Sequence, residues 1–227
     1  KLSDLVMFYS SKDKKLTTLK EYTERMKEGQ ESIYYACGES VDKIDMMPQV
    51  ESVKDKYEVL YLTEYVDEFT IITLAEYEGK KFVNVSSENT DISTEEEKKH
   101  INEINDNNKD MLSSMKDLLG DSVKEVKFTS KLKNHPVCLT TEGEVSTSME
   151  KVINSMPTGE KIKASEVLEI NSNHKIADKL KELYKDNKEE FEKYTKVIYF
   201  EARLIEGLPI DNPTEMSNLM CDIMADK

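Results

Sequence analysis

The feature that most constrains the fold of this chain is a predicted helix over residues 188–206. Its apolar side chains lie on more than one helical stripe, and a helix that is apolar on two faces needs two partners to cover them. Gly207 and Pro209 end this helix. A partner for its second face must therefore come from another segment or from another chain.

A last helix is predicted to follow, with Asn212 as its N-cap, Pro213 at its first position and Glu215 in its first turn. Its apolar residues recur at i, i+3, i+4, i+7 and i+8 and form one stripe. This stripe either docks on the preceding helix or forms a subunit interface, in which two helices from each chain make a four-helix bundle. The two-faced helix before it favours the interface. The expected dimer contacts are Phe191, Tyr194, Val197, Ile198, Ile205, Met216, Leu219, Met220, Ile223 and Met224.

Helical and strand patterns alternate over the first 85 residues. Strands are predicted at 32–37, 57–62 and 81–85, and helices at 16–27, 40–45 and 64–75. Strands separated by a helical crossover indicate a parallel pair in a small sheet. Residues 86–94 are almost entirely polar, so we expect a small α/β subdomain over 1–88 and a second domain over 89–227.

The second domain is expected to begin with one long helix, from a capping box at Thr94 and Glu97 to Gly120. Residues 123–130 and 136–141 are predicted to form two strands of an antiparallel sheet, with 164–170 a candidate third strand. A further helix is expected over 174–184, before the C-terminal helical dimerisation bundle. The predicted fold class is therefore mixed α+β.

Charge and cysteine content exclude several classes of function. The 227 residues carry 32 basic and 46 acidic side chains, and a net charge of −14 disfavours binding to nucleic acid and to anionic membranes. No apolar run approaches the roughly 20 residues that span a bilayer. Three cysteines at positions 37, 138 and 221 fit neither a metal site nor a disulfide framework, which indicates reduced thiols in a cytoplasmic protein. A start at Lys1 rather than Met fits a fragment of a longer chain.

The sequence contains no evident catalytic motif. Its seven glycines make neither a phosphate-binding loop nor a dinucleotide fingerprint, so we expect no ATP site and no metal in this segment. His100, His135 and His174 are isolated in sequence, and Cys138 in an apolar strand fits a buried structural thiol. An enzyme housed in residues 1–85 is the alternative, but no nucleophile or base is evident there. We therefore predict that the chain is not an enzyme.

One short helix, predicted over residues 145–156, has an apolar face rich in methionine. Thr147 and Glu150 stand at capping-box spacing, and Pro157 ends the helix. The face either packs on a neighbouring sheet as ordinary core or lies exposed and binds other polypeptides, since flexible methionines repack around varied partners. Its members are Val145, Met149, Val152, Ile153 and Met156.

Several motifs resemble the heat-shock protein 90 chaperones. Glu21-Tyr-Thr-Glu-Arg-Met-Lys-Glu-Gly-Gln30 before Ile33-Tyr-Tyr35, then Tyr57-Glu-Val-Leu-Tyr-Leu62 and Val66-Asp-Glu-Phe69, is similar to the end of that family's middle domain. The family's C-terminal domain is matched in order by Val123–Phe128, Leu132–Thr141, Met149, Glu169-Ile-Asn171 with His174, and Asn212-Pro213. The resemblance covers essentially the whole chain.

This resemblance implies a homodimeric, ATP-driven chaperone whose last two helices form the dimer bundle. ATP and magnesium would bind in a domain that precedes Lys1. Client contacts in the bacterial branch are associated with an exposed helix at 145–153 and an aromatic at Phe69, where bacterial members often have tryptophan. The chain ends straight after the last helix, at Lys227, without the tail of eukaryotic cytosolic members, which favours the bacterial branch. The expected client-binding residues are Phe69, Val145, Met149, Val152, Ile153 and Met156, and the alternative is a purely structural dimerisation module without direct client contact.

Overall fold

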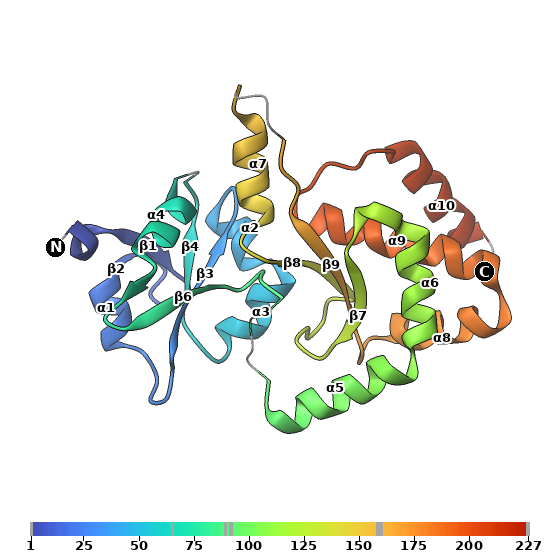
Figure 1. Cartoon of the computed structure of the whole chain (residues 1–227), viewed down its shortest axis with the longest axis horizontal. Coiled ribbons are helices and arrows are strands. Elements are labelled where there is room, and N and C mark those ends of the chain that lie inside the picture. Colours follow the sequence, from blue (N-terminus) through green and yellow to red (C-terminus); the bar gives the residue numbers. More distant parts are fainter. Residues whose placement is uncertain (1, 65, 89, 91–92, 158–160, 226–227) are drawn as a thin grey trace. The chain divides into compact units, whose positions relative to one another are not determined.

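The computed structural model describes residues 2–64, 66–88, 90, 93–157 and 161–225 (Figure 1). Helices and strands are mixed along the chain, which confirms the predicted α+β class. The chain divides into two compact units. Unit 1 contains Lys1–Asp91 and Thr141–Ala164, and unit 2 contains Ile92–Thr140 and Ser165–Lys227. The predicted division after residue 88 differs in one segment, since Thr141–Ala164 packs with unit 1 and not with the rest of 89–227.

Unit 1 is built on a six-stranded sheet with the strand order β2-β1-β4-β3-β6-β5. Its strands are β1 (Met7–Ser10), β2 (Leu16–Thr18), β3 (Ser32–Cys37), β4 (Val59–Leu62), β5 (Glu76–Tyr77) and β6 (Lys80–Asn84). The central strand β3 pairs in parallel with both β4 and β6, which confirms the predicted parallel pair. Strands β1, β2 and β5 pair antiparallel at the two edges.

Helices cover both faces of this sheet, which explains why β4 is buried at every position. They are α1 (Leu19–Glu24), α2 (Val41–Asp45), α3 (Pro48–Lys54) and α4 (Asp67–Leu74), and a 3-10 turn spans Leu2–Leu5. Leu19 of α1 and Ile71 of α4 join Ile33 and Leu60 in one hydrophobic core. The helix predicted over 16–27 is wrong at its start, because residues 16–18 pair with β1 as β2 and Thr18 then caps α1.

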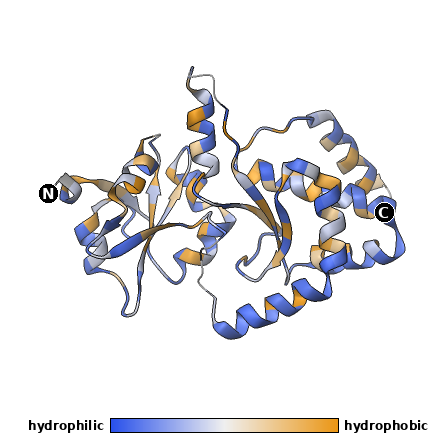
Figure 2. Ribbon diagram, in the orientation of Figure 1, coloured by the Kyte–Doolittle hydropathy of each residue, from blue (hydrophilic) through white to orange (hydrophobic). Residues whose placement is uncertain are grey.

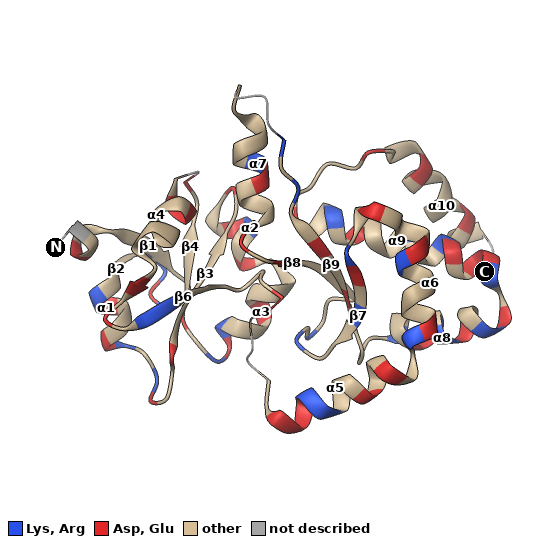
Figure 3. Ribbon diagram, in the orientation of Figure 1, with Lys and Arg blue, Asp and Glu red and all other residues tan. Residues whose placement is uncertain are grey.

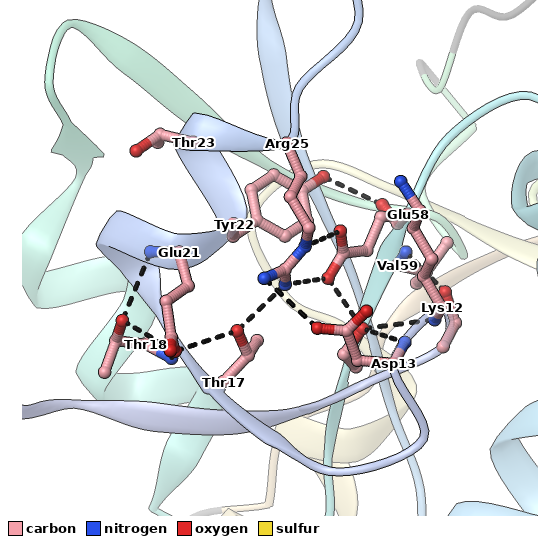
Figure 4. A network of polar contacts seen from close by, with 12 residues as sticks. Lys12, Asp13, Thr17, Thr18, Glu21, Tyr22, Thr23, Arg25, Glu58 and Val59 are labelled. Atoms are coloured by element: carbon pink, nitrogen blue, oxygen red, sulfur yellow. Dashed lines mark hydrogen bonds and ion pairs between the residues drawn. The ribbon is translucent and has the colours of Figure 1, made fainter.

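A polar network fastens α1 to the first strands of unit 1 (Figure 4). The Arg25 guanidinium binds Glu58 through two hydrogen bonds, from Nε at 3.0 Å and from Nη2 at 2.6 Å. The Ser10 hydroxyl donates to the same carboxylate at 2.6 Å, and Asp13 pairs with Arg25 at 3.2 Å. Hydrogen bonding to Glu58 raises the pKa of Arg25. The network thus joins the β1–β2 hairpin, α1 and the residue before β4.

Unit 2 is built on a three-stranded sheet with the order β7-β9-β8. The strands are β7 (Glu125–Thr129), β8 (Val137–Glu142) and β9 (Ser165–Asn171), and the last two residues of β8 belong to unit 1. The prediction that residues 123–130 and 136–141 pair antiparallel is wrong, because β9 lies between them and pairs in parallel with β7. Residues 166–171 are all buried, and a strand buried on both faces occupies the centre of a sheet.

Two helices replace the single long helix that was predicted before Gly120. They are α5 (Glu95–Asn107) and α6 (Lys109–Leu119), and Asn108 separates them with a non-helical backbone and a side-chain bond to the Ile104 carbonyl. The predicted capping box of Thr94 and Glu97 is present. Gly120 ends α6 at a positive φ of 57°, which confirms the predicted stop, and the 3-10 turn Gly120–Ser122 follows.

Three helices complete unit 2, namely α8 (Lys175–Asp186), α9 (Lys188–Ile205) and α10 (Pro213–Ala225). Figure 1 shows α6, α8 and α9 gathered beside the sheet, with α10 lying against α9. The core that these helices share with the sheet includes Met115, Phe128, Leu168, Leu180 and Phe191. Among the described residues, no helix has the length and apolar character needed to cross a membrane.

Candidate functional site

The short apolar helix predicted over 145–156 forms α7 (Thr147–Ser155) within unit 1. Its N-cap is Ser146, whose hydroxyl accepts a hydrogen bond from the Met149 amide at 3.0 Å. The predicted capping box of Thr147 and Glu150 is therefore wrong, because the N-cap lies one residue earlier and Met149 stands at the third helical position. The helix stops at Ser155, before Pro157, as predicted.

Polar side chains attach α7 to the segment that leads away from it. The Asn154 amide group accepts from the Ile162 amide at 2.9 Å and donates to the Ile162 carbonyl at 2.8 Å, as a neighbouring strand would. The Ala164 amide donates to the Glu150 carboxylate at 2.7 Å. Thr147 is the one buried residue of this helix. The side of α7 that is bound to the protein is thus its polar side.

The apolar side of α7 is only partly enclosed. None of its five members is buried, and none belongs to either hydrophobic core. Val145, Met149, Val152 and Ile153 are half-buried, and Met156 is 45% exposed. Figure 2 shows hydrophobic residues along α7, and Figure 3 shows that charged residues are few there. A surface helix of a globular protein normally buries its apolar stripe, whereas the stripe of α7 is no more enclosed than Glu150 and Asn154 on its polar side.

Helix α4 carries a second apolar surface of unit 1. The predicted contact residue Phe69 is half-buried, while Val66 and Ile72 are 67% and 48% exposed. These three residues are spaced by three positions, so they share one side of the helix. Glu68 and Ile71 point inward and are buried. The family resemblance indicated only Phe69 on this helix, and the spacing of Val66 and Ile72 is the sequence signal that points to the larger surface.

A buried carboxylate connects α4 to α7. Glu68 accepts a hydrogen bond from the Ser146 hydroxyl at 2.6 Å and another from the Asn84 amide group at 2.9 Å. The Tyr35 hydroxyl donates to it at 3.4 Å, and burial followed by the charge of Glu68 raises the pKa of Tyr35. The residue that caps α7 is thereby bonded to the residue next to Phe69. The apolar surfaces of α4 and α7 share one polar anchor.

The last helix forms as predicted, with Asn212 accepting from the Glu215 amide at 3.0 Å and Pro213 at the first position. None of its described residues is buried. Met216, Leu219, Met220 and Ile223 are half-buried, and Met224 is 63% exposed. Contact with α9 therefore leaves part of this apolar stripe uncovered, most of all at Met224.

The expected interface residues of α9 fall into two groups. Phe191, Val197 and Ile198 are buried within the chain itself, and a side chain already enclosed has little further area to bury against a partner. Tyr194 is half-buried and Ile205 is exposed. We therefore restrict the candidate dimer surface to Tyr194, Ile205 and the stripe of α10. The three buried residues instead hold α9 on its own unit.

Residues with catalytic potential are dispersed. In the described part of the chain, no three His, Cys, Asp or Glu side chains gather as metal ligands. His174 caps α8 by accepting from the Ile176 amide at 3.2 Å, which is a structural role. Burial raises the pKa of the Cys138 thiol well above its ordinary value, and a thiol held in that form is a poor nucleophile.

Comparison with known proteins places these features in a family. The chain matches the family described as Hsp90 protein over residues 1–227. It is 51% identical over 224 residues to the chaperone protein HtpG of Clostridium botulinum (strain 657 / Type Ba4). The HtpG chaperones of Clostridium perfringens (strain 13 / Type A) and Bacillus subtilis (strain 168) are 50% and 48% identical over the same length.

Each of these alignments covers 98% of this chain but only 36% of the relative. The chain thus spans little more than a third of the length of the curated relatives it matches. The resemblance found in the motifs between Glu21 and Pro213 is confirmed at this level. Because the family profile covers every residue and about half of the aligned positions are identical, the chain belongs to the Hsp90 protein family.

Proposed function

We propose that this chain is the homodimerisation and client-binding part of an ATP-dependent molecular chaperone. Its relatives are named chaperones and belong to the same family. ATP and magnesium bind, in this proposal, in the portion of the longer protein that the present chain does not cover. The chain itself then acts by binding polypeptides in the cytoplasm and has no catalytic step of its own.

The single observation that carries client binding is the incompletely buried apolar side of α7. Glu150 and Asn154 hold the polar side of the helix to residues 162 and 164, while the apolar side is left without a buried member. Apolar surface that stays in contact with water favours association with a partly folded protein, which exposes similar surface. The two methionines suit clients of different shape because their side chains are flexible.

The surface on α4 extends this site. Val66 and Ile72 are among the more exposed large apolar residues of unit 1, and Phe69 lies between them in sequence. An extended or partly folded client segment is able to contact both helices because the bond from Ser146 to Glu68 joins their polar sides. We propose that Phe69, Val66 and Ile72 bind clients together with the apolar face of α7.

Homodimerisation is proposed from the stripe on α10. No described residue of this helix is fully buried by its own chain, and the apolar area that remains exposed is what a second copy would cover. Isologous pairing of α9 and α10 with the same two helices of the partner would give a four-helix bundle.

The client proposal is tested with the double variant Met149→Ser and Ile153→Ser. We expect binding of a chemically unfolded, labelled model protein to weaken about tenfold or more, since two apolar contacts of roughly 1 kcal/mol each are lost. The free energy of unfolding should change little because neither side chain is buried. Lys151→Ser, on the same helix but outside the apolar face, is the matched control and should bind normally.

Two outcomes would contradict the proposal. If the double variant binds clients as well as the wild type, the chain is a structural dimerisation module without direct client contact. If its unfolding free energy instead drops by several kcal/mol, α7 contributes to the core and the apolar face is not a free surface.

A further inference from the structure

The connection between α9 and α10 begins with a defined helix stop at the end of α9. The Leu208 amide donates to the Arg203 carbonyl at 2.8 Å and the Gly207 amide donates to the Leu204 carbonyl at 3.0 Å. Gly207 has a positive φ of 67°, so these bonds form the glycine-dependent stop known as a Schellman motif. Leu208 then enters the core of unit 2. The direction in which the chain leaves α9 is thereby set.

The side chain of Arg203 fixes the next part of this connection. Its Nε and Nη2 atoms both donate to the Pro209 carbonyl oxygen, at 3.0 and 2.9 Å. Two bonds from one planar group to one oxygen hold that carbonyl in the plane of the guanidinium. The backbone just before α10 is therefore attached to the last turn of α9.

The other end of the guanidinium is attached to the centre of unit 2. Arg203 Nη1 pairs with the Glu166 carboxylate at 3.3 Å and donates to the Tyr199 hydroxyl at 3.0 Å. The Glu166 side chain lies on β9 and is 2% exposed, and that of Arg203 is 12% exposed. A buried ion pair has little freedom to shift, so Arg203 ties the α9–α10 connection to the sheet.

Helix α10 has few other polar attachments in the part of the chain that the structure describes. Lys196 of α9 binds Glu215 at 2.8 Å in the first turn of α10, where both side chains are over one-third exposed. No residue beyond that turn is buried in the described part of α10. The N-terminal end of α10 thus has polar attachments to α9, and the rest of the helix lies against α9 through partly buried apolar side chains.

We propose that Arg203 is a positioning residue for the dimer: it fixes the angle at which α10 leaves α9 and so sets the apolar stripe in the orientation that a second copy requires. This inference rests on the proposed homodimerisation. Lysine cannot replace arginine here, because one ammonium group cannot donate twice to Pro209 and also pair with Glu166 in plane. An error of angle at the start of a helix grows along its length, so Met224 would be displaced most.

The test measures dimer affinity and dimer geometry separately. Arg203→Lys is compared with the wild-type chain by sedimentation equilibrium, and we expect its dimer dissociation constant to rise about tenfold, the effect of losing one good charge-assisted contact. For geometry, a spin label is placed by Asn218→Cys in a background with Cys37→Ser and Cys221→Ser. Position 218 is exposed and lies opposite the apolar stripe. The distance distribution between the two labels of a dimer should be narrow in the wild type and broader or shifted in Arg203→Lys.

Arg25→Lys is the matched control, since Arg25 also pairs with a buried carboxylate but lies in unit 1. It should lower stability without changing either readout.

If Arg203→Lys does not fold, the double variant Arg203→Gln and Glu166→Gln removes both charges together and is expected to show the same loss of dimer affinity. If the wild type is a dimer and the Arg203 variants have the same dimer dissociation constant and the same label distance, this inference fails. The proposed dimer would then still stand. A monomeric wild type at micromolar concentration would overturn the proposed dimer and the inference with it.

Discussion

Ser146 and Glu68 form a 2.6 Å hydrogen bond in which the hydroxyl that caps α7 is also the donor to a buried carboxylate of α4. One side chain thus performs two tasks, starting a helix and satisfying a buried charge. This hydrogen bond links the two helices that carry the apolar surfaces of unit 1. Removing the Ser146–Glu68 hydrogen bond should displace α7 more than it displaces the strands of the sheet.

We expect Ser146→Ala to reduce the free energy of unfolding by about 1–3 kcal/mol, because it removes the N-cap and leaves Glu68 with one donor fewer. Hydrogen exchange should become faster at the α7 amides, beginning with Met149, while β3 amides keep their protection. Ser146→Thr retains both bonds and serves as the control. Unchanged exchange in Ser146→Ala would mean that the 161–164 segment alone holds the helix.

The second prediction concerns the Arg25–Glu58 pair of Figure 4. Arg25→Ala leaves the Glu58 carboxylate, 7% exposed, with the Ser10 hydroxyl as a donor but without its cation, and losing a hydrogen-bonded charged partner of this kind costs about 1.5–3 kcal/mol. Urea unfolding monitored by tyrosine fluorescence measures this loss. Lys20→Ala is the comparison, since its pair with Glu24 is exposed and worth about 0.3–0.5 kcal/mol. Similar losses for both variants would show that Glu58 is solvated in solution.

Local sequence signals predicted much of this fold. Thr94 with Glu97, Gly120, and Asn212 with Pro213 each begin or end a helix where expected, because caps and stops depend on neighbouring residues alone. The start of α1 was missed since Leu16 pairs with Tyr9 across a hairpin, and pairing overrides a helical pattern. Asn108 interrupts α5 and α6 through its own side chain, which periodicity does not reveal.

Features that depend on contacts between distant residues could not be predicted. The position of β9 between β7 and β8 follows from burial on both of its faces, and sequence order suggested otherwise. For α7, periodicity revealed an apolar stripe but not the direction it faces. That direction is set by Asn154 and Glu150, whose backbone partners lie 8 and 14 residues away in sequence.

The third prediction is a dependence of stability on pH through Glu201. Burial raises the pKa of this carboxyl above its ordinary value of 4.5, and the nearby His174 opposes the shift. A raised folded-state pKa favours folding while the group is protonated, and this contribution is lost as the pH rises through the folded pKa. Glu201→Gln, which cannot ionise, should therefore be more stable than the wild type at pH 7. The difference should shrink as the pH falls to 4.5 and below, as measured by thermal unfolding at a series of pH values. An equal difference at pH 4 and pH 7 would point to packing and not to ionisation.

The fourth prediction concerns the stripe of α10. Leu219 is half-buried in the single chain, so part of its side chain is available to a second copy. Leu219→Ser should raise the dimer dissociation constant about three- to tenfold, because less than half of the roughly 1.5–3 kcal/mol for burying a whole leucine side chain is left to be gained on dimerisation. Sedimentation equilibrium over a range of concentrations measures the change, and circular dichroism verifies that the helices remain. Asn218→Ser, adjacent in sequence but opposite the stripe, is the matched control and should leave the dissociation constant within about twofold, a difference below 0.5 kcal/mol. If both variants dimerise equally well, the pairing surface lies elsewhere on the chain, and the uncovered stripe of α10 requires a different partner.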